Sequence, residues 1–258
     1  MNEFVNVLPA FLLVLVRVLA FFAVLPFYGH RTVPNTFKIG LGFFLALTMI
    51  FTLDAPVIVV DATYYLLIFK EALVGLVVGL IAMVLLYAIQ IAGGLIDYSM
   101  GFMIANVMDP QTGAQTPLTG SFLYTFALLF MLLVDGHHLL LDGIYYSYTF
   151  VPMDQVFLPF GQGDVIQYIA TTFNAMFIVA FQMAFPIVGS LFLVDVGLGM
   201  VSRAVPQMNV FVVGMPLKIL VGLLLLTVFM GVFFMIVQRL FDQIILAMRT
   251  LLQLLGGV

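Results

Sequence analysis

The sequence contains no cysteine and very little charge, and both absences exclude whole classes of function. Without cysteine the chain forms no disulfide, uses no thiolate nucleophile and offers no cysteine ligand to a metal. Only 8 lysine and arginine residues occur among 258, and they do not cluster. A protein that grips nucleic acid needs a basic surface for the phosphates, so nucleic acid is not an expected partner.

Catalytic and cofactor motifs are also missing. The chain has no Walker, dinucleotide-binding or Ser/His/Asp signature and no HExxH pattern. Asp97, Asp109 and Asp195 lie at the ends of hydrophobic segments rather than as a pair within helices, which argues against an intramembrane protease. We therefore predict that the protein is not an enzyme and that it uses no cofactor and no metal.

Hydrophobic residues dominate the composition. They make up 64% of the sequence and charged residues 8%, whereas soluble proteins average roughly 45–50% and about 25%. A helix needs about 20 apolar residues to cross a bilayer. Six candidate segments occur, at 4–25, 39–53, 72–96, 121–134, 165–194 and 216–238. The sequence therefore predicts an all-α integral membrane protein.

These segments are too irregular for six independent helices in lipid. The second and fourth are short, while the fifth runs for 30 uncharged residues and contains Pro186. If all six segments cross the membrane, the lysine and arginine residues other than Arg17 divide three against four between its two sides. Charge bias therefore does not set the orientation. We expect an irregular multi-helix bundle of about six hydrophobic segments with broken helices, forming part of a hetero-oligomeric channel.

Two further stretches organise the second half of the chain. The connector 149–164 is rich in proline and glycine and is the best boundary in the sequence. The C-terminal stretch 239–255 places Arg239, Asp242 and Arg249 on one face of a helix that is otherwise largely apolar. This amphipathic helix is predicted to lie along a membrane surface or against a partner helix.

The longest interruption of the hydrophobic pattern, residues 97–120, is the strongest candidate for a working part. Its first half is apolar and contains Met100 and Met103, and the turn residues Asp109 and Pro110 follow later. Methionine is flexible enough to seal a gap, and an apolar constriction can close a pore by excluding water. The pattern supports either a plug inside a conduit or a re-entrant segment packed under neighbouring helices.

Unusual residues inside the hydrophobic segments predict contacts with other groups. An unpaired charge at the position of Arg17 costs about 2.5–3.5 kcal/mol on insertion scales, so the guanidinium needs a partner. Asp97, Asp195, the carbonyls of a broken helix or another chain could provide one, or the side chain could reach the membrane surface from a shifted helix. In the third segment, Gly75 and Gly79 form a GxxxG pair that allows another helix to approach closely.

A polar cluster follows the fourth segment. Asp135, His137, His138 and Asp142 resemble metal ligands at helical spacing, with His138 and Asp142 four residues apart. A zinc site would need a third ligand and supporting hydrogen bonds. The pattern is more typical of a polar helix end at the membrane interface, beside several tyrosines.

Four stretches, distributed between residues 17 and 223, together carry a resemblance to a known family through their sequences and their order. They are RVLAFFAVLPFYGHRTVPNTFKIGL from Arg17, GLIDYSMGFMIANVMDPQTGAQTPL from Gly94, VDGHHLLL from Val134 and SRAVPQMNVFVVGMPLKILVGL from Ser202. As an ordered set they resemble the FliR family of flagellar type III export gate proteins, which is related to the SctT family of injectisomes.

The resemblance implies a non-enzymatic subunit of the type III export gate, needed for flagellum assembly. Such a subunit would form the channel with FliP and FliQ, work with FlhB and FlhA, pass unfolded flagellar export substrates and contact membrane lipid. Its location would be the bacterial inner membrane, in the flagellar basal body. Residues 1–258 would form a single subunit, with a FliP-like part at 1–148, the connector at 149–164 and a FliQ-like part at 165–258.

The resemblance also assigns roles to particular residues. In the family, the segment that aligns with 106–117 closes the channel. The residues expected at the plug or constriction are Met100, Met103, Asn106, Val107, Met108, Asp109 and Pro110. Those expected to make inter-subunit contacts or to be buried charges are Arg17, Arg31, Arg203 and Lys218.

Three alternatives stay open on the sequence alone. The chain could belong to the injectisome branch, which shares the pattern. It could be a stand-alone transporter or channel, with Arg17, Asp97 and Asp195 forming an ion site at the membrane midplane. It could also be a structural scaffold whose loop affects assembly and never ion leakage.

Overall fold

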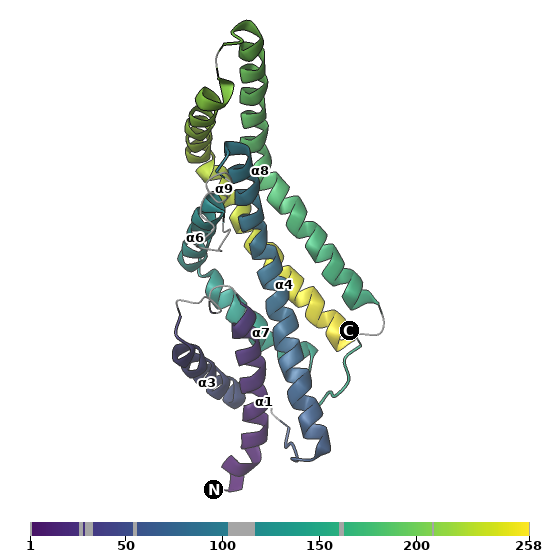
Figure 1. Ribbon diagram of the computed structural model, residues 1–258. Coiled ribbons are helices and arrows are strands. Elements are labelled where there is room, and N and C mark those ends of the chain that lie inside the picture. Colours follow the sequence, from purple (N-terminus) through teal and green to yellow (C-terminus); the bar gives the residue numbers. More distant parts are fainter. Residues whose placement is uncertain are drawn as a thin grey trace. The chain divides into compact units, whose positions relative to one another are not determined.

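The computed structural model describes residues 2–25, 28, 33–53, 56–102, 117–159, 163–207 and 209–257. Within these residues there are seven α-helices and no strand (Figure 1). The helices are α1 (Asn2–Val24), α3 (Asn35–Thr52), α4 (Ala62–Met100), α6 (Leu118–Leu133), α7 (Gly136–Phe150), α8 (Asp164–Ala204) and α9 (Val210–Gly256). Five are long and apolar enough to cross a membrane, and six crossings result if α6 and α7 count as one. The predicted all-α membrane class is confirmed.

The helices extend further than the hydrophobic pattern indicates. α4 continues towards its N-terminus through Lys70 and Glu71, which the sequence places ahead of the third segment. α8 is helical to Ala204, although the fifth hydrophobic segment ends at residue 194. α9 joins the sixth segment to the amphipathic tail in one helix, because no glycine or proline interrupts residues 232–255.

Two compact units divide the chain, and each draws on several parts of the sequence. Unit 1 comprises Met1–Leu85, Asp135–Phe173 and Phe241–Val258, and unit 2 comprises Leu86–Val134 and Asn174–Leu240. These units are defined by contacts, and both take residues from either side of the connector. The division into FliP-like and FliQ-like parts stays a prediction.

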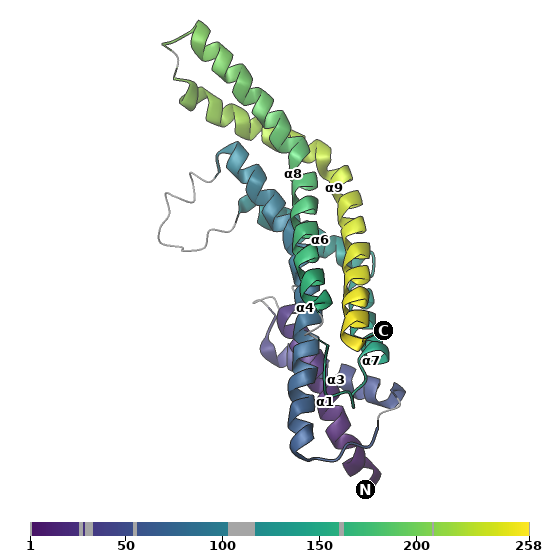
Figure 2. The ribbon, with the colours of Figure 1, turned by 90° about the vertical axis from the view of Figure 1, so that its right-hand side faces the viewer.

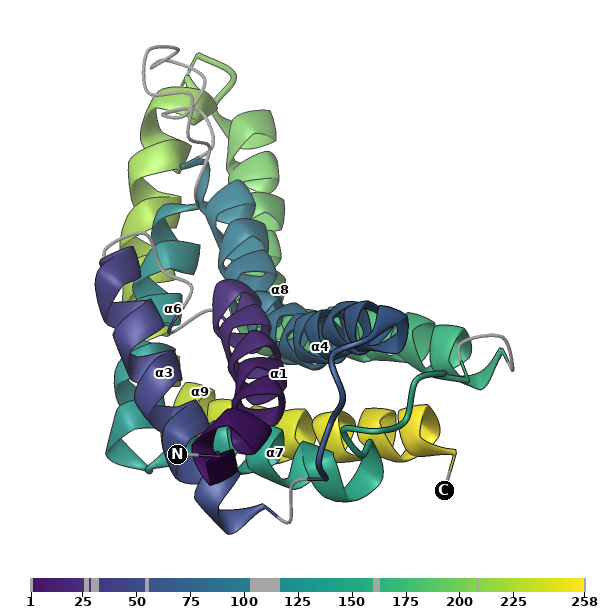
Figure 3. The same ribbon diagram turned by 90° about the horizontal axis from the view of Figure 1, so that it is seen from below.

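In unit 1, α4 packs closely against α1 through its two glycines. A Cβ on Gly75 would collide with the carbonyl oxygen of Arg17, and one on Gly79 would lie 3.1 Å from the carbonyl oxygen of Phe21. The GxxxG pair therefore receives α1. On another side of α1 lies α3 (Figures 1 and 3), with the rings of Phe11 and Phe43 in edge contact at 5.3 Å.

The C-terminal part of α9 belongs to unit 1 and packs against α7. A Cβ on Gly143 of α7 would lie 2.6 Å from Met248 Cε, and one on Gly256 would collide with the backbone of Phe150. The polar residues Arg239 and Arg249 are exposed, and the opposite face of the tail is buried. The apolar face of the amphipathic tail therefore packs against α7 of the same chain.

In unit 2, α8 and α9 follow one another along the chain and run side by side (Figure 2). Gly214 of α9 makes room for Leu198 of α8, since a Cβ there would lie 2.9 Å from Leu198 Cδ1. α6 contacts α9 through Phe130 and Phe234, whose ring centroids are 5.0 Å apart. α6 therefore packs against α9, which in turn packs against α8.

Candidate functional site

The segment 103–116 carries most of the predicted plug residues and lies outside the described residues, but the structure defines where the chain leaves α4. Gly101 follows the helix with φ +91°, a left-handed conformation that glycine adopts without a steric penalty. The amides of Gly101 and Phe102 donate to the carbonyl oxygens of Tyr98 (3.2 Å) and Asp97 (3.0 Å). This pair of bonds is a Schellman C-cap, which fixes the direction of exit.

The chain returns at Pro117, directly before α6. Proline has no side chain able to cap the helix, and no side-chain cap is made there, so the first amides of α6 need another acceptor. The buried carboxylate of Asp97 supplies it, with its two oxygens 3.0 and 3.2 Å from the amide nitrogen of Thr119. Its negative charge also interacts favourably with the N-terminal end of the helix dipole.

Two glycines bring α4 and α6 into backbone contact beside this hydrogen bond. A Cβ on Gly93 would overlap the backbone of Gly120, and one on Gly120 would lie 2.9 Å from the carbonyl oxygen of Gln90. A larger side chain at either position would separate the two helices. The exit from α4 and the entry into α6 are therefore held together by both the Asp97 carboxylate and the glycine contact.

Met100, one of the predicted plug residues, is fully buried against α9. A Cβ on Gly222 would lie 2.8 Å from Met100 Cγ, so the glycine provides the space that the methionine occupies. Met100 also borders a hollow of about 410 Å³ that is lined by α8 and α9. Beside it, Lys218 Nζ donates to Asp195 Oδ2 at 2.9 Å. Met100 is therefore an anchor at the base of the segment.

Apart from Arg17, the other predicted residues fall into two groups. Arg203 is exposed in the last turn of α8, where the helix dipole favours a cation, and Lys218 has a partner within the chain. Outside the described residues lie Met103, Asn106, Val107, Met108, Asp109, Pro110 and Arg31. Their assigned roles stay predictions.

A second feature, in unit 1, is a buried charge cluster centred on Arg17 and Glu71. The Arg17 guanidinium binds both carboxylate oxygens of Glu71, from Nε to Oε2 and from Nη2 to Oε1, the latter at 2.9 Å. Its other donors reach the hydroxyl of Ser147 (2.8 Å) and the carbonyl oxygen of Val151 (3.0 Å). The guanidinium also lies 3.7 Å from the ring centroid of Tyr148, a favourable cation–π contact.

Lys70 adds a second cation to this cluster. Its ammonium binds Glu71 Oε1 and donates to the carbonyl oxygens of Pro152 (2.9 Å) and Met153 (3.2 Å). Two cations thus share one carboxylate, and backbone carbonyl dipoles complete their coordination. The cluster ties α1, α4, α7 and the start of the connector together inside one chain.

Sequence reasoning missed Glu71 as the partner of Arg17. The structure gives the two carboxylates considered for that role other partners, since Asp97 caps α6 and Asp195 binds Lys218. Glu71 directly follows Lys70 in an otherwise apolar stretch, and this adjacent pair of opposite charges is the signal that could have identified it. We expected the two residues to precede the helix rather than to lie within it.

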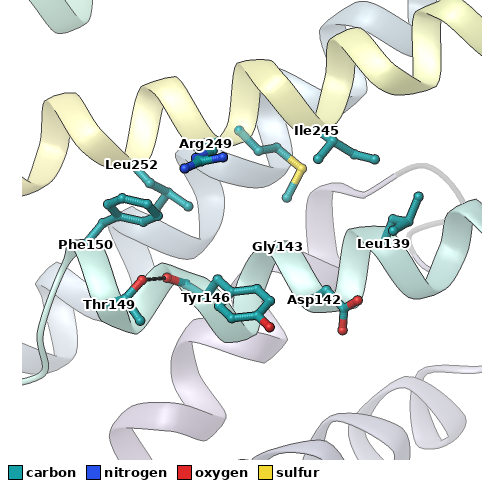
Figure 4. A pocket seen from close by; sticks show the side chains of 10 residues that line it. Leu139, Asp142, Gly143, Tyr146, Thr149, Phe150, Ile245, Arg249 and Leu252 are labelled. Atoms are coloured by element: carbon teal, nitrogen blue, oxygen red, sulfur yellow. Dashed lines mark hydrogen bonds between the residues drawn. The ribbon is translucent and has the colours of Figure 1, made fainter.

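α7 and the tail of α9 enclose a mainly apolar hollow of about 420 Å³ (Figure 4). Asp142 and Tyr146 come from α7, and Ile245 and Arg249 come from the facing α9. The Thr149 hydroxyl donates to the carbonyl oxygen of Tyr146 within α7 at 2.6 Å. Because two apolar helix faces form most of the lining, the hollow offers packing space rather than a set of converging catalytic groups.

Known proteins resemble the chain over most of its length. The family described as bacterial export proteins, family 1, matches residues 8–244. The chain is 56% identical over 257 residues to flagellar biosynthetic protein FliR of Bacillus subtilis (strain 168), covering 99% of each chain. It is 31% identical over 226 residues to the Yop proteins translocation protein T of Yersinia pestis, covering 86% of each chain. These matches include residues of both compact units.

Proposed function

The chain belongs to the bacterial export proteins, family 1, and from this premise we propose that it is a flagellar type III export gate subunit that forms a channel with FliP and FliQ. The resemblance drawn from the four sequence stretches is confirmed by the family match and by the 56% identity to a FliR protein. The family consists of export proteins rather than enzymes, so the protein is not an enzyme.

The flagellar branch is favoured over the injectisome branch by the degree of similarity. Identity reaches 56% with a flagellar biosynthetic protein and 31% with a Yop translocation protein, and the first match covers more of the chain. In this proposal the protein lies in the bacterial inner membrane at the flagellar basal body. It works with FlhB and FlhA, and the substrates are unfolded flagellar proteins.

The segment 103–116 serves in this proposal as the plug that closes the channel at rest. The observation that carries this assignment is the construction of its two ends. Gly101 turns the chain out of α4, and Asp97 captures the start of α6, so both ends are held at one place. A segment with fixed ends and an apolar, methionine-bearing sequence can seal a passage without disturbing the helices around it.

An equal-length replacement tests the plug directly. Residues 103–116 would be replaced by glycine and serine, leaving Gly101, Pro117 and Asp97 in place, and the complex with FliP and FliQ would be purified. We expect the replaced complex to assemble and to conduct small ions far more than the unaltered complex in planar bilayers. A matched control replaces the mainly exposed, non-helical residues 56–60 in the same way and should leave conductance unchanged.

Two results would contradict parts of the proposal separately. A correctly assembled complex with unchanged conductance would remove the plug and favour the scaffold alternative. Failure of the unaltered chain to copurify with FliP and FliQ, shown by native mass measurement, would remove the shared channel itself.

The stand-alone transporter alternative has less support. It requires Arg17, Asp97 and Asp195 to share one ion site, yet each is engaged by a different partner. Transport by the purified chain alone would revive this alternative. The division into a FliP-like part at 1–148 and a FliQ-like part at 165–258 remains part of the proposal, with the non-helical stretch after α7 as its junction.

A further inference from the structure

The start of α7 gathers three side chains that can ligate a metal. One ligand atom from each of Asp135, His137 and His138 lies within 4.8 Å of the others. The two imidazole rings have centroids 4.1 Å apart, with their planes inclined by 38°. Asp135 has φ 56° and accepts the amide of His138 on its carbonyl oxygen at 3.0 Å. The left-handed residue therefore holds its carboxylate beside the first turn of α7.

We propose that Asp135, His137 and His138 form a binding site for one divalent transition-metal ion, with Zn²⁺ as the probe ion. This site uses none of the residues at the base of 103–116 and none of the buried charge cluster. It is independent of the proposed export function.

The donor set selects the class of ion. Imidazole nitrogen suits Zn²⁺, Ni²⁺ and Cu²⁺, and a single carboxylate is compatible with all three. Ca²⁺ and Mg²⁺ prefer six or more oxygen ligands, which one aspartate does not provide. Two imidazoles and one carboxylate leave a coordination position for water, as in three-ligand zinc sites.

The separation of the donors is close to what an ion requires. Zinc binds nitrogen and oxygen at about 2.0–2.2 Å, so two ligand atoms on one ion lie at most about 4.4 Å apart. Side-chain rotation within the 4.8 Å cluster is enough to close this gap. His138 and Asp135 are exposed and His137 is half-buried, so the ion can enter from outside and two of its ligands are free to adjust.

His137 supplies an independent observation. Its Nδ1 atom is buried and makes no hydrogen bond to any described residue. A buried ring nitrogen without a partner is unfavourable. An ion coordinated by this nitrogen would give it a partner. The sequence pattern named Asp135, His137, His138 and Asp142 and favoured a polar helix end without a metal; in the structure the ligand atoms of the first three residues come within 4.8 Å of one another.

Metal binding by the full-length chain tests the proposal. The chain would be purified in detergent with a tag that contains no histidine, stripped with EDTA and titrated with Zn²⁺ against a chromophoric chelator. We expect one equivalent of Zn²⁺ to bind. Affinity should fall by about tenfold or more in His137→Gln, His138→Gln and Asp135→Asn, since even groups that only orient a metal ligand contribute that much.

Two matched variants control for non-specific binding. Asp142→Asn removes a nearby carboxylate of α7, and His30→Ala removes the third histidine of the chain; both should bind Zn²⁺ as the unaltered chain does. Failure of the unaltered chain to bind one equivalent overturns the proposal, as does binding that survives His137→Gln with His138→Gln. If those variants do not fold, the visible absorption spectrum of Co²⁺ bound to the unaltered chain is the second measurement. A spectrum that shows no imidazole ligation of the Co²⁺ overturns the proposal.

Discussion

Arg17 on α1 and Glu71 on α4 form a two-pronged ion pair in which neither side chain is exposed to solvent. The residues are 54 positions apart in sequence, so the pair forms only when the two helices pack. Gly75, one turn along α4 from Glu71, allows that packing because its missing side chain leaves room for the Arg17 carbonyl. Charge pairing and close backbone approach therefore depend on the same contact.

Removing the carboxylate should destabilise the protein more than removing the guanidinium. Glu71→Gln leaves Arg17 and Lys70 buried without an anion, and breaking a buried pair from one side costs about 3–5 kcal/mol. Arg17→Met should lose less, because Lys70 still neutralises Glu71. Thermal unfolding in detergent and the steady-state amount in membranes would measure this order.

The exposed pair in unit 2 provides the comparison. Lys218 and Asp195 are 2.9 Å apart, but the aspartate is 48% exposed. Because protein does not enclose this pair as it encloses Arg17 and Glu71, Lys218→Met should change stability by only about 0–1 kcal/mol, as for other exposed pairs. For the buried pair, equal losses of stability in Glu71→Gln and Arg17→Met would contradict the role given to Lys70.

The buried pair shows where prediction from sequence reaches its limit. The cost of a charge in lipid predicts that Arg17 has a partner, but it does not identify that partner among several carboxylates. Glu71 was overlooked because charge was taken as a helix boundary. Lys70 and three backbone carbonyls neutralise and coordinate the charges internally, so α4 continues through them.

The close contact between α1 and α4 gives a second prediction. Gly75→Ala would place a methyl group on the Arg17 carbonyl, and overpacking of this kind costs about 1–3 kcal/mol. Gly79→Ala meets the Phe21 carbonyl at 3.1 Å and should be milder. Gly40→Ala is the control, since a Cβ added at Gly40 meets nothing within 4 Å. A helix favours alanine over glycine by about 1 kcal/mol, so this substitution should not destabilise the protein. A Gly75→Ala protein as stable as the unaltered one would contradict the packing.

The GxxxG pair, in contrast to the ion pair, is readable from sequence because its meaning is local. Two glycines four residues apart lie on one helix face whatever the rest of the chain does. The pattern predicts a close neighbour, and only the structure identifies it as α1. The same holds for the tail, whose polar face follows from helical periodicity, while its packing on α7 depends on the complementary Gly143.

Asp61 makes the start of α4 sensitive to pH. Its Oδ1 accepts the Thr63 hydroxyl and the amides of Thr63 (2.9 Å) and Tyr64 (3.2 Å). The Thr63 hydroxyl, followed by these amides, lowers the pKa of the Asp61 carboxyl below its usual value. A lowered pKa in the folded state means that the stabilisation is present at neutral pH and is lost as pH falls through that lowered pKa.

The melting temperature of the unaltered chain and of Asp61→Asn, followed against pH, would measure this effect. We expect Asp61→Asn to be less stable at neutral pH, since the amide lacks the negative charge that favours a helix N-terminus. The difference should shrink as the solution becomes acid enough to protonate Asp61. A difference independent of pH would show that the charge of this cap does not contribute.

Asp97 connects the stability of α6 to the proposed plug. Asp97→Ala removes the acceptor of the Thr119 amide, and loss of an N-terminal cap costs about 0.5–2 kcal/mol. Hydrogen exchange at Thr119 should therefore accelerate, while Asp97→Asn, which keeps an acceptor oxygen, should have a smaller effect. Asn209→Ala is the matched control, because Asn209 caps α9. Its Oδ1 accepts the amide of Phe211 at 3.2 Å.

The functional consequence separates Asp97 from an ordinary cap. If the ends of 103–116 must be held for the segment to close the channel, Asp97→Ala should raise ion conductance through the assembled complex, and Asn209→Ala should not. The reason is positional, since Asp97 is both the residue that accepts the Phe102 amide on its carbonyl oxygen and the one that captures α6 with its carboxylate. Faster exchange at Thr119 without any rise in conductance would show that the anchor stabilises α6 and is not needed for closure.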